Sequence, residues 1–448
     1  MDQLTLSVDD ALIARIEGKT ATVGIIGLGY VGLPLAVEVC RSGYRAVGFD
    51  TDQRRNAELR AHRSYIEAVP DDALAEFIGA KKLDATSDEK ALGACDVVIV
   101  CVPTPLDADR GPDLGHVLAA SRSIARNIRR GVLVVIESTV QPGATVDFVK
   151  PILDATGLRC GEDYFLAYSP ERVDPGNQKH RTHSIPKLFA GVEAESTRVG
   201  LALYSRIFGR VIPVSSTGVA EAAKLTENVF RAVNIALVND LKIAFDAIGI
   251  DVWEVIEAAS TKPFGYMPFH PGPGLGGHCI PVDPIYLQWS ARAAGAPSKL
   301  IDAASEVNDR MPHHVVERLG AHLKATQGMD LKGAKVLVIG MAYKPNISDV
   351  RESPGLEILD LLRRAGATPL FHDPLVDSLR PPWASERDIV MRSTPLTAQS
   401  TGEADAALIV TDHDSIDYAL LSENARLIVD TRNAMRKRGL PTKNVRMA

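Results

Sequence analysis

The stretch from Thr22 to Asp50 constrains the fold of this chain more than any other part of its sequence. Thr22–Ile26 is a short apolar run that leads directly into the turn Gly27–Gly32. A helical pattern follows from Leu33 to Ser42, and Arg45–Asp50 reads as a second strand that ends in an acid. A strand, Gly-x-Gly-x-x-Gly, a helix and an acid-terminated strand form a complete dinucleotide-binding fingerprint. The sequence therefore predicts a parallel α/β sheet at the N-terminus.

The glycines of this turn allow a diphosphate to approach the backbone, where the free N–H groups of a helix N-terminus attract it. Asp50 is expected to accept the ribose hydroxyls and to repel a 2′-phosphate, which favours NAD over NADP. Arg55 complicates that preference, because it can contact the ribose or the pyrophosphate. The expected cofactor contacts of the turn are Gly27, Leu28, Gly29, Tyr30, Val31 and Gly32.

Two further apolar strands, Asp96–Val102 and Val132–Ile136, have polar residues at their carboxyl ends. Thr104 follows the first strand, and Glu137 and Thr139 follow the second. Ligands bind beyond the carboxyl ends of strands in open α/β sheets, so these three residues are candidates for ligand contact. The alternative is that they only cap the next helices.

The same order of elements recurs near the C-terminus. Strands are expected at Lys335–Gly340, Thr368–Asp373, Asp405–Thr411 and Leu427–Arg432, with a helix at Ser353–Arg364. This order predicts a second Rossmann-like half. Its turn, Gly340–Lys344, lacks the second and third glycines, so we do not expect a second dinucleotide to bind there in the same way. Lys344 and Arg351 are candidate cations for a different diphosphate.

Between the halves, Ala220–Ile248 is a helical stretch that is apolar on most sides from Val229 onward, which is typical of burial between domains or subunits. Lys224 and Asn228 share one face of it, although by residue type alone they could be a solvated polar stripe. The predicted fold class is α/β, with two Rossmann-like parallel-sheet domains joined by a long central helix. The predicted domains are residues 1–215, 216–325 and 326–448.

Composition excludes several functional classes. The chain has 448 residues, which predicts more than one domain, and 46% hydrophobic with 24% charged residues is typical of a soluble protein without a membrane span. A net charge of −6 without a basic tract argues against nucleic acid as a partner. Five widely spaced cysteines and scattered histidines predict reduced thiols and no metal site. The N-terminus has no apolar signal segment, so we expect a cytoplasmic protein.

Cys279 lies in the stretch Pro271–Pro284, which is rich in glycine and proline. Such a backbone is tightly fixed and leaves room for close approach to a ligand. A thiol beside a nicotinamide can carry an alcohol past the aldehyde to the acid, because a thiolate captures the carbonyl. The alternative is a rigid loop with a buried, inert cysteine.

Together these motifs resemble the UDP-glucose/GDP-mannose dehydrogenase superfamily of nucleotide-sugar dehydrogenases. The resemblance implies an N-terminal NAD domain, a central helical dimerisation region with the cysteine loop, and a C-terminal domain that binds a UDP-sugar. The protein is thus expected to be a homodimer or a higher homo-oligomer. The matching motifs, which cover nearly the whole chain in family order, are Gly27–Gly32, Cys101–Pro105, Glu137–Thr139, Ser169–Arg172, Lys224 with Asn228, Gly274–Asp283 and Lys344–Arg351.

Within this family, Gly277–Asp283 and Ser169–Gly176 depart from the UDP-glucose branch and look like the UDP-N-acetylhexosamine 6-dehydrogenases. Lys262–Tyr266 looks most like the enzymes that oxidise UDP-N-acetylglucosamine for surface polysaccharide. UDP-glucose, UDP-GalNAc and UDP-ManNAc stay open as alternative substrates.

The resemblance also implies a four-electron oxidation of the sugar C6 alcohol with two NAD. Cys279 would form a thiohemiacetal and then a thioester. Lys224, Asn228 and Asp283 would hold a water that takes the alcohol proton, and Lys224 and Asn228 would stabilise the oxyanions. Glu171 or Asp283 would activate water for the final hydrolysis.

The other implied contacts are shared between the two ligands. Thr104, Thr139 and Arg351 are expected to contact the cofactor, and Thr139 also belongs to the catalytic set. Substrate contacts are expected from Glu171, Arg172, Lys224, Asn228, Phe269, Gly274, Gly276, Lys344 and Arg432.

Two other functions share part of this pattern. A two-electron dehydrogenase of the β-hydroxyacid type has the same N-terminal fingerprint and a helical Lys and Asn pair, but it needs neither Cys279 nor a second Rossmann-like half. A non-catalytic NAD-binding regulator is disfavoured because every expected catalytic residue type is present.

Overall fold

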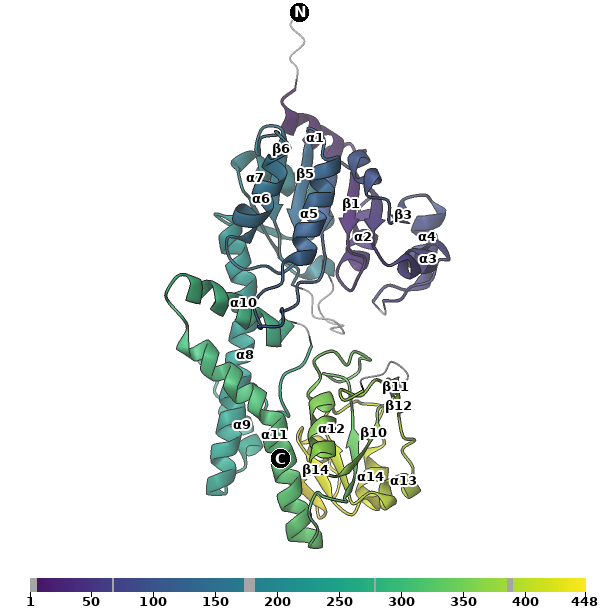
Figure 1. Cartoon of the computed structure of the whole chain (residues 1–448), viewed down its shortest axis with the longest axis vertical. Coiled ribbons are helices and arrows are strands. Elements are labelled where there is room, and N and C mark those ends of the chain that lie inside the picture. Colours follow the sequence, from purple (N-terminus) through teal and green to yellow (C-terminus); the bar gives the residue numbers. More distant parts are fainter. Residues whose placement is uncertain (1–5, 67, 173–181, 278, 385–389) are drawn as a thin grey trace, which may run out of the picture. The chain divides into compact units, whose positions relative to one another are not determined.

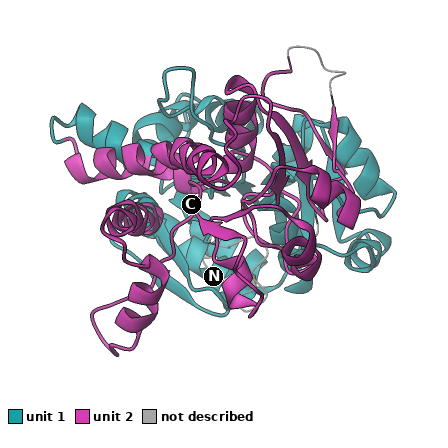
Figure 2. Cartoon of the chain, turned by 90° about the horizontal axis from the view of Figure 1, so that it is seen from below, with its two compact units in different colours: residues 1–227, 285–296 teal, residues 228–284, 297–448 magenta. Residues whose placement is uncertain are grey.

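The computed structural model describes residues 6–66, 68–172, 182–277, 279–384 and 390–448. His278 and the Val173–Gly176 part of the motif after Arg172 lie outside the described residues. The chain divides into two compact units: residues 1–227 with 285–296, and residues 228–284 with 297–448 (Figure 2). The three predicted domains remain a prediction, which these two units do not test.

The first unit contains an eight-stranded sheet in the order β3-β2-β1-β4-β5-β6-β7-β8, in which only the β6–β7 pair is antiparallel. Its central strands are buried along their length, as expected for parallel strands that are covered on both faces. The predicted strands β1, β2, β4 and β5 are confirmed, whereas the other four were not predicted. The strands are β1 Thr22–Ile26, β2 Arg45–Phe49, β3 Leu83–Thr86, β4 Val97–Val100, β5 Val132–Ile136, β6 Tyr164–Tyr168, β7 Lys187–Gly191 and β8 Val211–Pro213.

Helices connect these strands and lie against the sheet (Figure 1). The predicted helix after the glycine turn is α2, and it begins at the last glycine of the fingerprint. The helices are α1 Val8–Glu17, α2 Gly32–Arg41, α3 Gln53–Arg60, α4 Asp71–Gly79, α5 Gly115–Asn127, α6 Lys150–Asp154 and α7 Ala194–Ile207. Short turns of other helix types occur at Glu89–Ala94, Thr145–Val149 and Thr182–Ser184.

The second unit contains a five-stranded parallel sheet in the order β10-β9-β13-β14-β15. The predicted Rossmann-like half is therefore confirmed, and only the last strand was missed. Its strands are β9 Lys335–Ile339, β10 Thr368–His372, β13 Ala406–Ile409, β14 Ile428–Asp430 and β15 Val445–Met447, with a separate pair β11 Ser378–Leu379 and β12 Met391–Arg392. Its helices are α12 Pro354–Arg364, α13 Ala398–Glu403, α14 Tyr418–Asn424 and α15 Ala434–Lys437.

The predicted central helix is α8, Thr217–Ile248, which has 32 residues and starts three residues earlier than expected. It is followed by α9 Val252–Ser260, α10 Cys279–Ala293 and α11 Lys299–Gln327. Some of the apolar side chains of α8 are exposed in this chain: Phe230 is 50% exposed and Leu237 is 53% exposed. Across the described residues, none of the helices is both long and apolar enough to cross a membrane.

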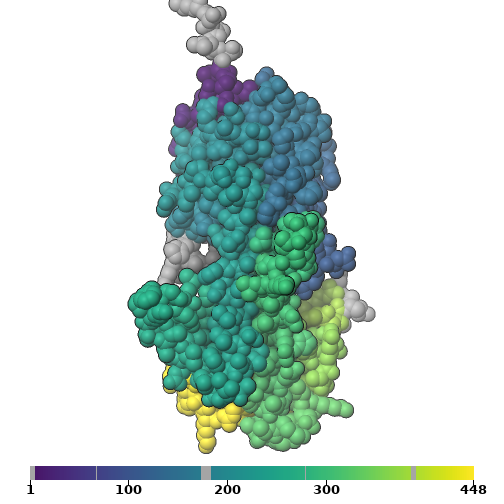
Figure 3. All heavy atoms as spheres, turned by 90° about the vertical axis from the view of Figure 1, so that its left-hand side faces the viewer, coloured from purple at the N-terminus to yellow at the C-terminus, as the bar shows by residue number. Residues whose placement is uncertain are grey.

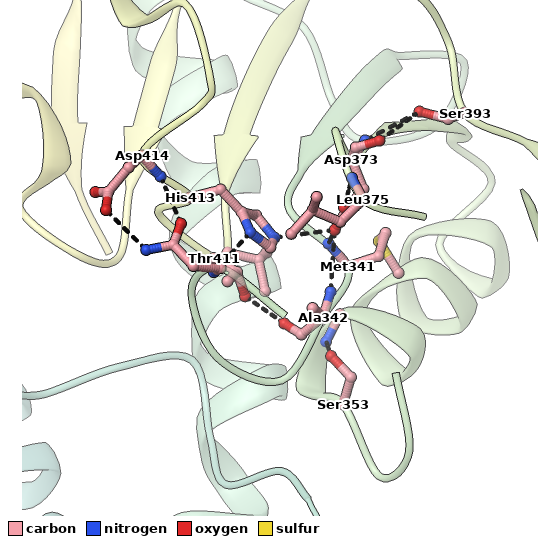
Figure 4. Close-up of polar contacts among 12 residues, drawn as sticks. Met341, Ala342, Ser353, Asp373, Leu375, Ser393, Thr411, His413 and Asp414 are labelled. Carbon is pink, nitrogen blue, oxygen red and sulfur yellow. Dashed lines mark hydrogen bonds and ion pairs between the residues drawn. The ribbon is translucent and has the colours of Figure 1, made fainter. Parts of the chain in front are cut away.

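Asp373, directly after β10, occupies the position of the fingerprint acid in the second sheet. Its Oδ2 accepts the backbone N–H groups of Met341 and Ala342 at 2.6 and 3.1 Å, and His413 Nε2 lies 3.1 Å away (Figure 4). The side chains of both Asp373 and His413 are completely buried. The acid is thus saturated by its own turn, which explains how a turn without the second and third glycines is held.

His413 is a neutral ring that donates to this acid. The backbone N–H of Asn346 donates to His413 Nδ1 at 3.0 Å, so Nδ1 carries no proton and Nε2 is the donor. Burial by itself raises the pKa of Asp373, but the hydrogen bonds from His413 and Met341 outweigh it, and the net pKa is lowered. The ionised acid therefore stabilises the fold of this unit.

We predict that Asp373→Asn lowers the free energy of unfolding by about 1–3 kcal/mol at pH 7, because it leaves buried donors without a charged acceptor. The lowered pKa means that this contribution is complete above the pKa of an unfolded Asp, about 3.9, and is lost as the pH falls through the folded value. The difference between the two proteins should therefore shrink below about pH 4. Chemical denaturation at several pH values measures it, with the exposed Asp377→Asn as the control; an effect that grows in acid would contradict the assignment.

Candidate active site

The glycine turn of the first sheet has the geometry that a diphosphate needs. Gly27 has a φ of +92°, and a Cβ there would lie 2.5 Å from the carbonyl oxygen of Cys101. A Cβ on Gly32 would lie 1.8 Å from the carbonyl oxygen of Gly27, so both positions require glycine. At Gly29, by contrast, a Cβ would meet nothing within 4 Å. The turn is therefore closed toward the protein and open where a dinucleotide would approach, which fits the predicted cofactor.

Asp50 is mostly buried and is shared between the turn and Arg55. Its Oδ2 accepts the backbone N–H of Leu28 at 3.0 Å and Arg55 Nη1 at 3.2 Å, while Oδ1 accepts the N–H of Asp52 at 2.9 Å. The Arg55 guanidinium also lies 5.6 Å from the centre of the Tyr65 ring. The positive charge of Arg55 is therefore directed toward Asp50. Of the other residues in the turn, Tyr30 is exposed and Val31 is half-buried.

The two threonines that follow β4 and β5 differ in burial. Thr104 is buried and Thr139 is half-buried. The Ser138 hydroxyl donates to the carbonyl oxygen of Val102 at 2.8 Å, which ties the two strand ends together. Thr104 and Thr139 thus follow the carboxyl ends of neighbouring parallel strands, as the sequence predicted.

Glu137 does not face a ligand, in contrast to its interpretation as a candidate for ligand contact. Its side chain is completely buried, and its two oxygens are used by Lys187 Nζ at 2.7 Å and by the hydroxyl of Tyr204 at 2.5 Å. Lys187 also binds Glu171 Oε2 at 2.8 Å. Sequence reasoning missed Lys187; the available signal was a lysine at the start of the apolar strand β7.

Arg172, an expected substrate contact, is engaged within the first unit. Its Nη2 lies 2.6 Å from Glu227 Oε1 on α8, and its Nη1 donates to the carbonyl oxygen of Pro186 at 2.7 Å. Its backbone N–H donates to Glu171 Oε1 at 2.9 Å. The two consecutive residues are thus held to different elements, Glu171 to β7 and Arg172 to α8.

Lys224 is the most unusual charged group on α8. Lys224 is only 8% exposed, yet it forms no hydrogen bond or ion pair with any other described residue. Lysine is almost never buried without a partner, because its charge loses hydration. This observation supports an anionic or oxygen-bearing ligand as its partner. Asn228 follows one helical turn later and is also buried.

Cys279 is the first residue of α10 and is exposed. Asp283, one turn later in the same helix, is buried and accepts Asn228 Nδ2 at 2.5 Å. A helix N-terminus favours an anion, so this position suits a thiolate. The alternative of a buried, inert Cys279 is therefore wrong on burial.

Two other cysteines show the contrast. Cys40 and Cys95 are buried, and burial raises the pKa of their thiols to about 12 and about 11. Buried thiols of this kind stay protonated and unreactive at neutral pH. Exposure at the start of a helix therefore distinguishes Cys279 from them.

The glycines before Cys279 have a packing reason. Gly274 has a φ of +130°, and a Cβ on Gly276 would lie 2.6 Å from the Cβ of Tyr343. The N–H of Gly277 donates to the carbonyl oxygen of Arg351 at 3.1 Å. The cysteine loop therefore packs closely on the loop after β9, and the predicted substrate contacts of Gly274 and Gly276 remain predictions.

The expected phosphate-binding cations belong to that second sheet. Lys344 is half-buried, and Arg351 is exposed and paired with Asp349 at 2.7 Å. Arg432, after β14, donates Nε to the carbonyl oxygen of Val410 at 2.8 Å. Burial lowers the pKa of Arg432, although its guanidinium stays charged.

Phe269, another expected substrate contact, packs on α8. Its ring meets the ring of Phe230 edge to face, with 5.8 Å between centres. It also packs against a small apolar cluster of Val238, Val252, Trp253 and Ile256. The structure therefore shows Phe269 as a partly buried ring that packs on this cluster, and its contact with substrate remains a prediction.

Comparison with known proteins gives three consecutive matches to sequence models of the UDP-glucose/GDP-mannose dehydrogenase family. The NAD binding domain matches residues 21–211, the central domain residues 218–310, and the UDP binding domain residues 337–437. Among similar proteins, UDP-N-acetyl-D-glucosamine 6-dehydrogenase of Pseudomonas aeruginosa is 40% identical over 88% of this chain and 91% of the relative. UDP-N-acetyl-D-mannosamine dehydrogenase of Pyrococcus horikoshii is 34% identical over 93% and 96%.

Solved structures agree with these matches. The structure of UDP-D-ManNAc dehydrogenase from Pyrococcus horikoshii has a TM-score of 0.85 and 32% identity, and it covers 95% of this chain and 98% of its own. A UDP-glucose dehydrogenase from Pyrobaculum islandicum has a TM-score of 0.82 and 28% identity over 95% and 96%. These proteins share the complete fold but are named for different sugars.

We predict that Asp50→Asn narrows the preference for NAD over NADP by roughly tenfold in kcat/KM, because a carboxylate no longer repels the 2′-phosphate and Arg55 loses its charged partner. Initial rates with both cofactors measure the ratio. Asp52→Asn is the matched control, since Asp52 caps α3 in the same loop. If the ratio of kcat/KM with NAD to that with NADP does not change in Asp50→Asn, Asp50 does not discriminate between the two cofactors at the ribose.

Proposed function

Because this chain belongs to the UDP-glucose/GDP-mannose dehydrogenase family, we propose that it oxidises the C6 primary alcohol of UDP-N-acetylglucosamine to the carboxylate, using two NAD. It is an NAD-dependent nucleotide-sugar dehydrogenase with a UDP binding domain. The choice of sugar is supported by the 40% identity to a relative named for UDP-N-acetyl-D-glucosamine, against 34% for one named for UDP-N-acetyl-D-mannosamine. The resemblance of Lys262–Tyr266 supports the same choice.

One observation carries the four-electron part of this proposal. Cys279 is exposed at the first position of α10, one turn before the buried Asp283 that Asn228 holds. A two-electron alcohol dehydrogenase has no use for such a thiol. A thiol that captures the aldehyde keeps the reactive carbonyl on the enzyme for the second oxidation.

In the proposed first oxidation, the side chains of Lys224, Asn228 and Asp283 hold the water that takes the hydroxyl proton. When bound, NAD would supply the hydride acceptor for each of the two oxidations. The turn Gly27–Gly32 holds the cofactor's diphosphate and Asp50 its ribose. The remaining cofactor contacts of this proposal are Arg55, Thr104, Thr139 and Arg351.

In the proposed second half, Cys279 adds to the aldehyde to give a thiohemiacetal, and oxidation converts it to a thioester. The cationic Lys224 and the amide of Asn228 stabilise the oxyanions of these tetrahedral stages. Glu171 activates water for hydrolysis, which releases the carboxylate. The proposed nucleotide and sugar contacts are Arg172, Phe269, Gly274, Gly276, Lys344 and Arg432, of which Lys344 and Arg432 supply positive charge for the diphosphate.

We also propose a homodimer whose interface includes α8. Phe230 and Leu237 are about half exposed and lie two turns apart on one side of this helix. On the face drawn in Figure 3, the part of the chain that includes α8 lies at the surface in teal. All five cysteines are free thiols, which supports a reducing, cytoplasmic location.

We predict that Leu237→Asp shifts the dimer toward the monomer at micromolar concentration, because it would bury an unpaired charge in the interface. Size-exclusion chromatography with light scattering measures the mass. Leu375→Asp is the control, since Leu375 is 45% exposed in the C-terminal sheet domain. A native protein that is already monomeric, or an equal effect of both variants, would contradict an interface at α8.

The function is tested by the yield of NADH per sugar. We predict two NADH per UDP-GlcNAc consumed, and faster turnover than with UDP-ManNAc, UDP-GalNAc, UDP-glucose or GDP-mannose. Cys279→Ser should depress the full reaction strongly, because an alkoxide is a poorer leaving group than a thiolate, while NAD binding and the fold remain intact. Mass spectrometry should then detect a trapped sugar-nucleotide adduct on the variant.

Other results would redirect the proposal. A yield of one NADH would indicate the two-electron β-hydroxyacid type of chemistry, and no NADH with any sugar would indicate a binding protein. Normal turnover of Cys279→Ser and Cys279→Ala without an adduct would mean that Cys279 only packs in its loop. A different preferred sugar would change the substrate and leave the chemistry in place.

A further inference from the structure

A charged cluster lies buried at the strand ends of the first sheet, next to the residue proposed to activate water. Lys187 Nζ, from β7, donates to Glu137 Oε2 at 2.7 Å, to Glu171 Oε2 at 2.8 Å and to the carbonyl oxygen of Pro170 at 3.3 Å. An ammonium has three N–H donors, so all of them are used. The two carboxylates are thus held on one cation.

The cluster becomes more exposed from Glu137 to Glu171. The exposed fraction of the side chain is 0% for Glu137, 3% for Lys187 and 13% for Glu171. The Tyr204 hydroxyl closes the inner end by donating to Glu137, and the ring of Phe208 lies 5.1 Å below the ammonium. Of the two carboxylates, only that of Glu171 is therefore partly accessible from outside the cluster.

We propose that Lys187 is a positioning residue that keeps the Glu171 carboxylate ionised and oriented for the hydrolysis of the thioester. This inference rests on the proposed function of Cys279 and Glu171. Lys187 itself touches neither substrate nor cofactor in this proposal. It acts through Glu171, and Glu137 with Tyr204 keeps Lys187 in place.

The charges explain why the lysine matters. The ammonium of Lys187 is the opposite charge beside Glu171, 2.8 Å from its carboxylate, and without it the mostly buried Glu171 would favour its protonated form, whether or not Glu137 is charged. Burial opposes the charge on Lys187, but Glu137 and Glu171 outweigh it, so the pKa of Lys187 is raised. A protonated Glu171 could not accept a proton from water. The titratable and charged groups that face the cluster are Cys101 after β4, Glu137 after β5, Glu171 and Arg172 after β6, Lys187 on β7, Tyr204 on α7 and Glu227 on α8.

The step that depends on Lys187 is the last one. Water adds to the thioester carbonyl while Glu171 accepts one of its protons, and the carbon–sulfur bond then breaks. The Cys279 thiolate leaves, the sugar acid ionises, and Glu171 returns its proton to solvent. No electrons move in this step, so both oxidations are complete before Lys187 is needed.

A purely structural role is the competing explanation. A buried ion pair contributes little net stability compared with apolar residues of the same size, but removing one partner is costly. The single variant Lys187→Met can therefore lose activity simply by unfolding. A test has to separate the charge on Glu171 from the stability of the cluster.

The experiment compares Lys187→Met with the double variant Lys187→Met/Glu137→Gln, in stopped-flow assays with UDP-GlcNAc and NAD. The double variant removes both charges of the inner pair, so it restores stability without restoring the cation beside Glu171. We expect both variants to release a burst of two NADH per active site, followed by turnover roughly 10²-fold slower than in the native enzyme. Mass spectrometry should show the thioester on Cys279. In the dependence of kcat on pH, the fall in kcat on the acidic side should begin at a higher pH than in the native enzyme.

Two further variants serve as controls. Lys187→Arg keeps a cation and should recover most of the turnover and the native pH profile. Lys242→Met removes an equally buried lysine, paired with Asp246 in the other unit, and should lower stability without a burst. If Lys187→Met does not fold, the double and the arginine variants decide the result.

The outcomes separate the two levels of inference. A native enzyme that releases only one NADH per sugar contradicts the proposed function itself. The role of Lys187 alone is overturned if the native enzyme releases two NADH per sugar and the double variant folds and keeps the native turnover and pH profile. Equal slowing of both oxidations without a burst or an adduct would also overturn it, because it would show a structural effect on the whole site.

Discussion

Much of this structure depends on the pairing of charge at the carboxyl edge of a buried parallel sheet. Strands β4, β5 and β6 are apolar along their length, so polar side chains occur only where the strands end. A carboxylate at such an edge must be either exposed to a ligand or neutralised by a partner. Glu137 follows the second course with Lys187, and this leaves Glu171 at the accessible end of the same pair.

Two buried lysines of the first unit illustrate the difference between support and function. Lys187 has all of its donors satisfied by protein oxygens, so its charge is used within the fold. Lys224 is nearly as buried but has no partner among the described residues, so the fold leaves its charge for something else. Satisfied hydrogen bonding is therefore a better guide to role here than burial or residue type alone.

The two sheets show how the same topology is adapted to different ligands. Both place an acid at the end of the strand that follows the first helix, Asp50 in one and Asp373 in the other. Asp50 accepts a single N–H from its turn, and its neighbour Gly29 is open. Asp373 accepts hydrogen bonds from two N–H groups of its turn and from His413 Nε2, so no acceptor position is left open toward a ligand. This arrangement fits a family in which the first domain binds NAD and the last binds UDP.

The sequence by itself determined the elements whose chemistry is local. The glycine turn, the apolar strands β1, β2, β4 and β5, the repeated order near the C-terminus and the exceptional cysteine loop could all be predicted, because steric limits and periodicity act over a few residues. It did not predict β3, β6, β7, β8, the pair β11 and β12, or β15. Only the tertiary structure decided that Glu137 is internal, that Lys187 joins it to Glu171, and that Asp283 is held by Asn228. The partners in these contacts are far apart in the chain, and which of two nearby carboxylates is buried depends on how strands pair and pack, which no local pattern records.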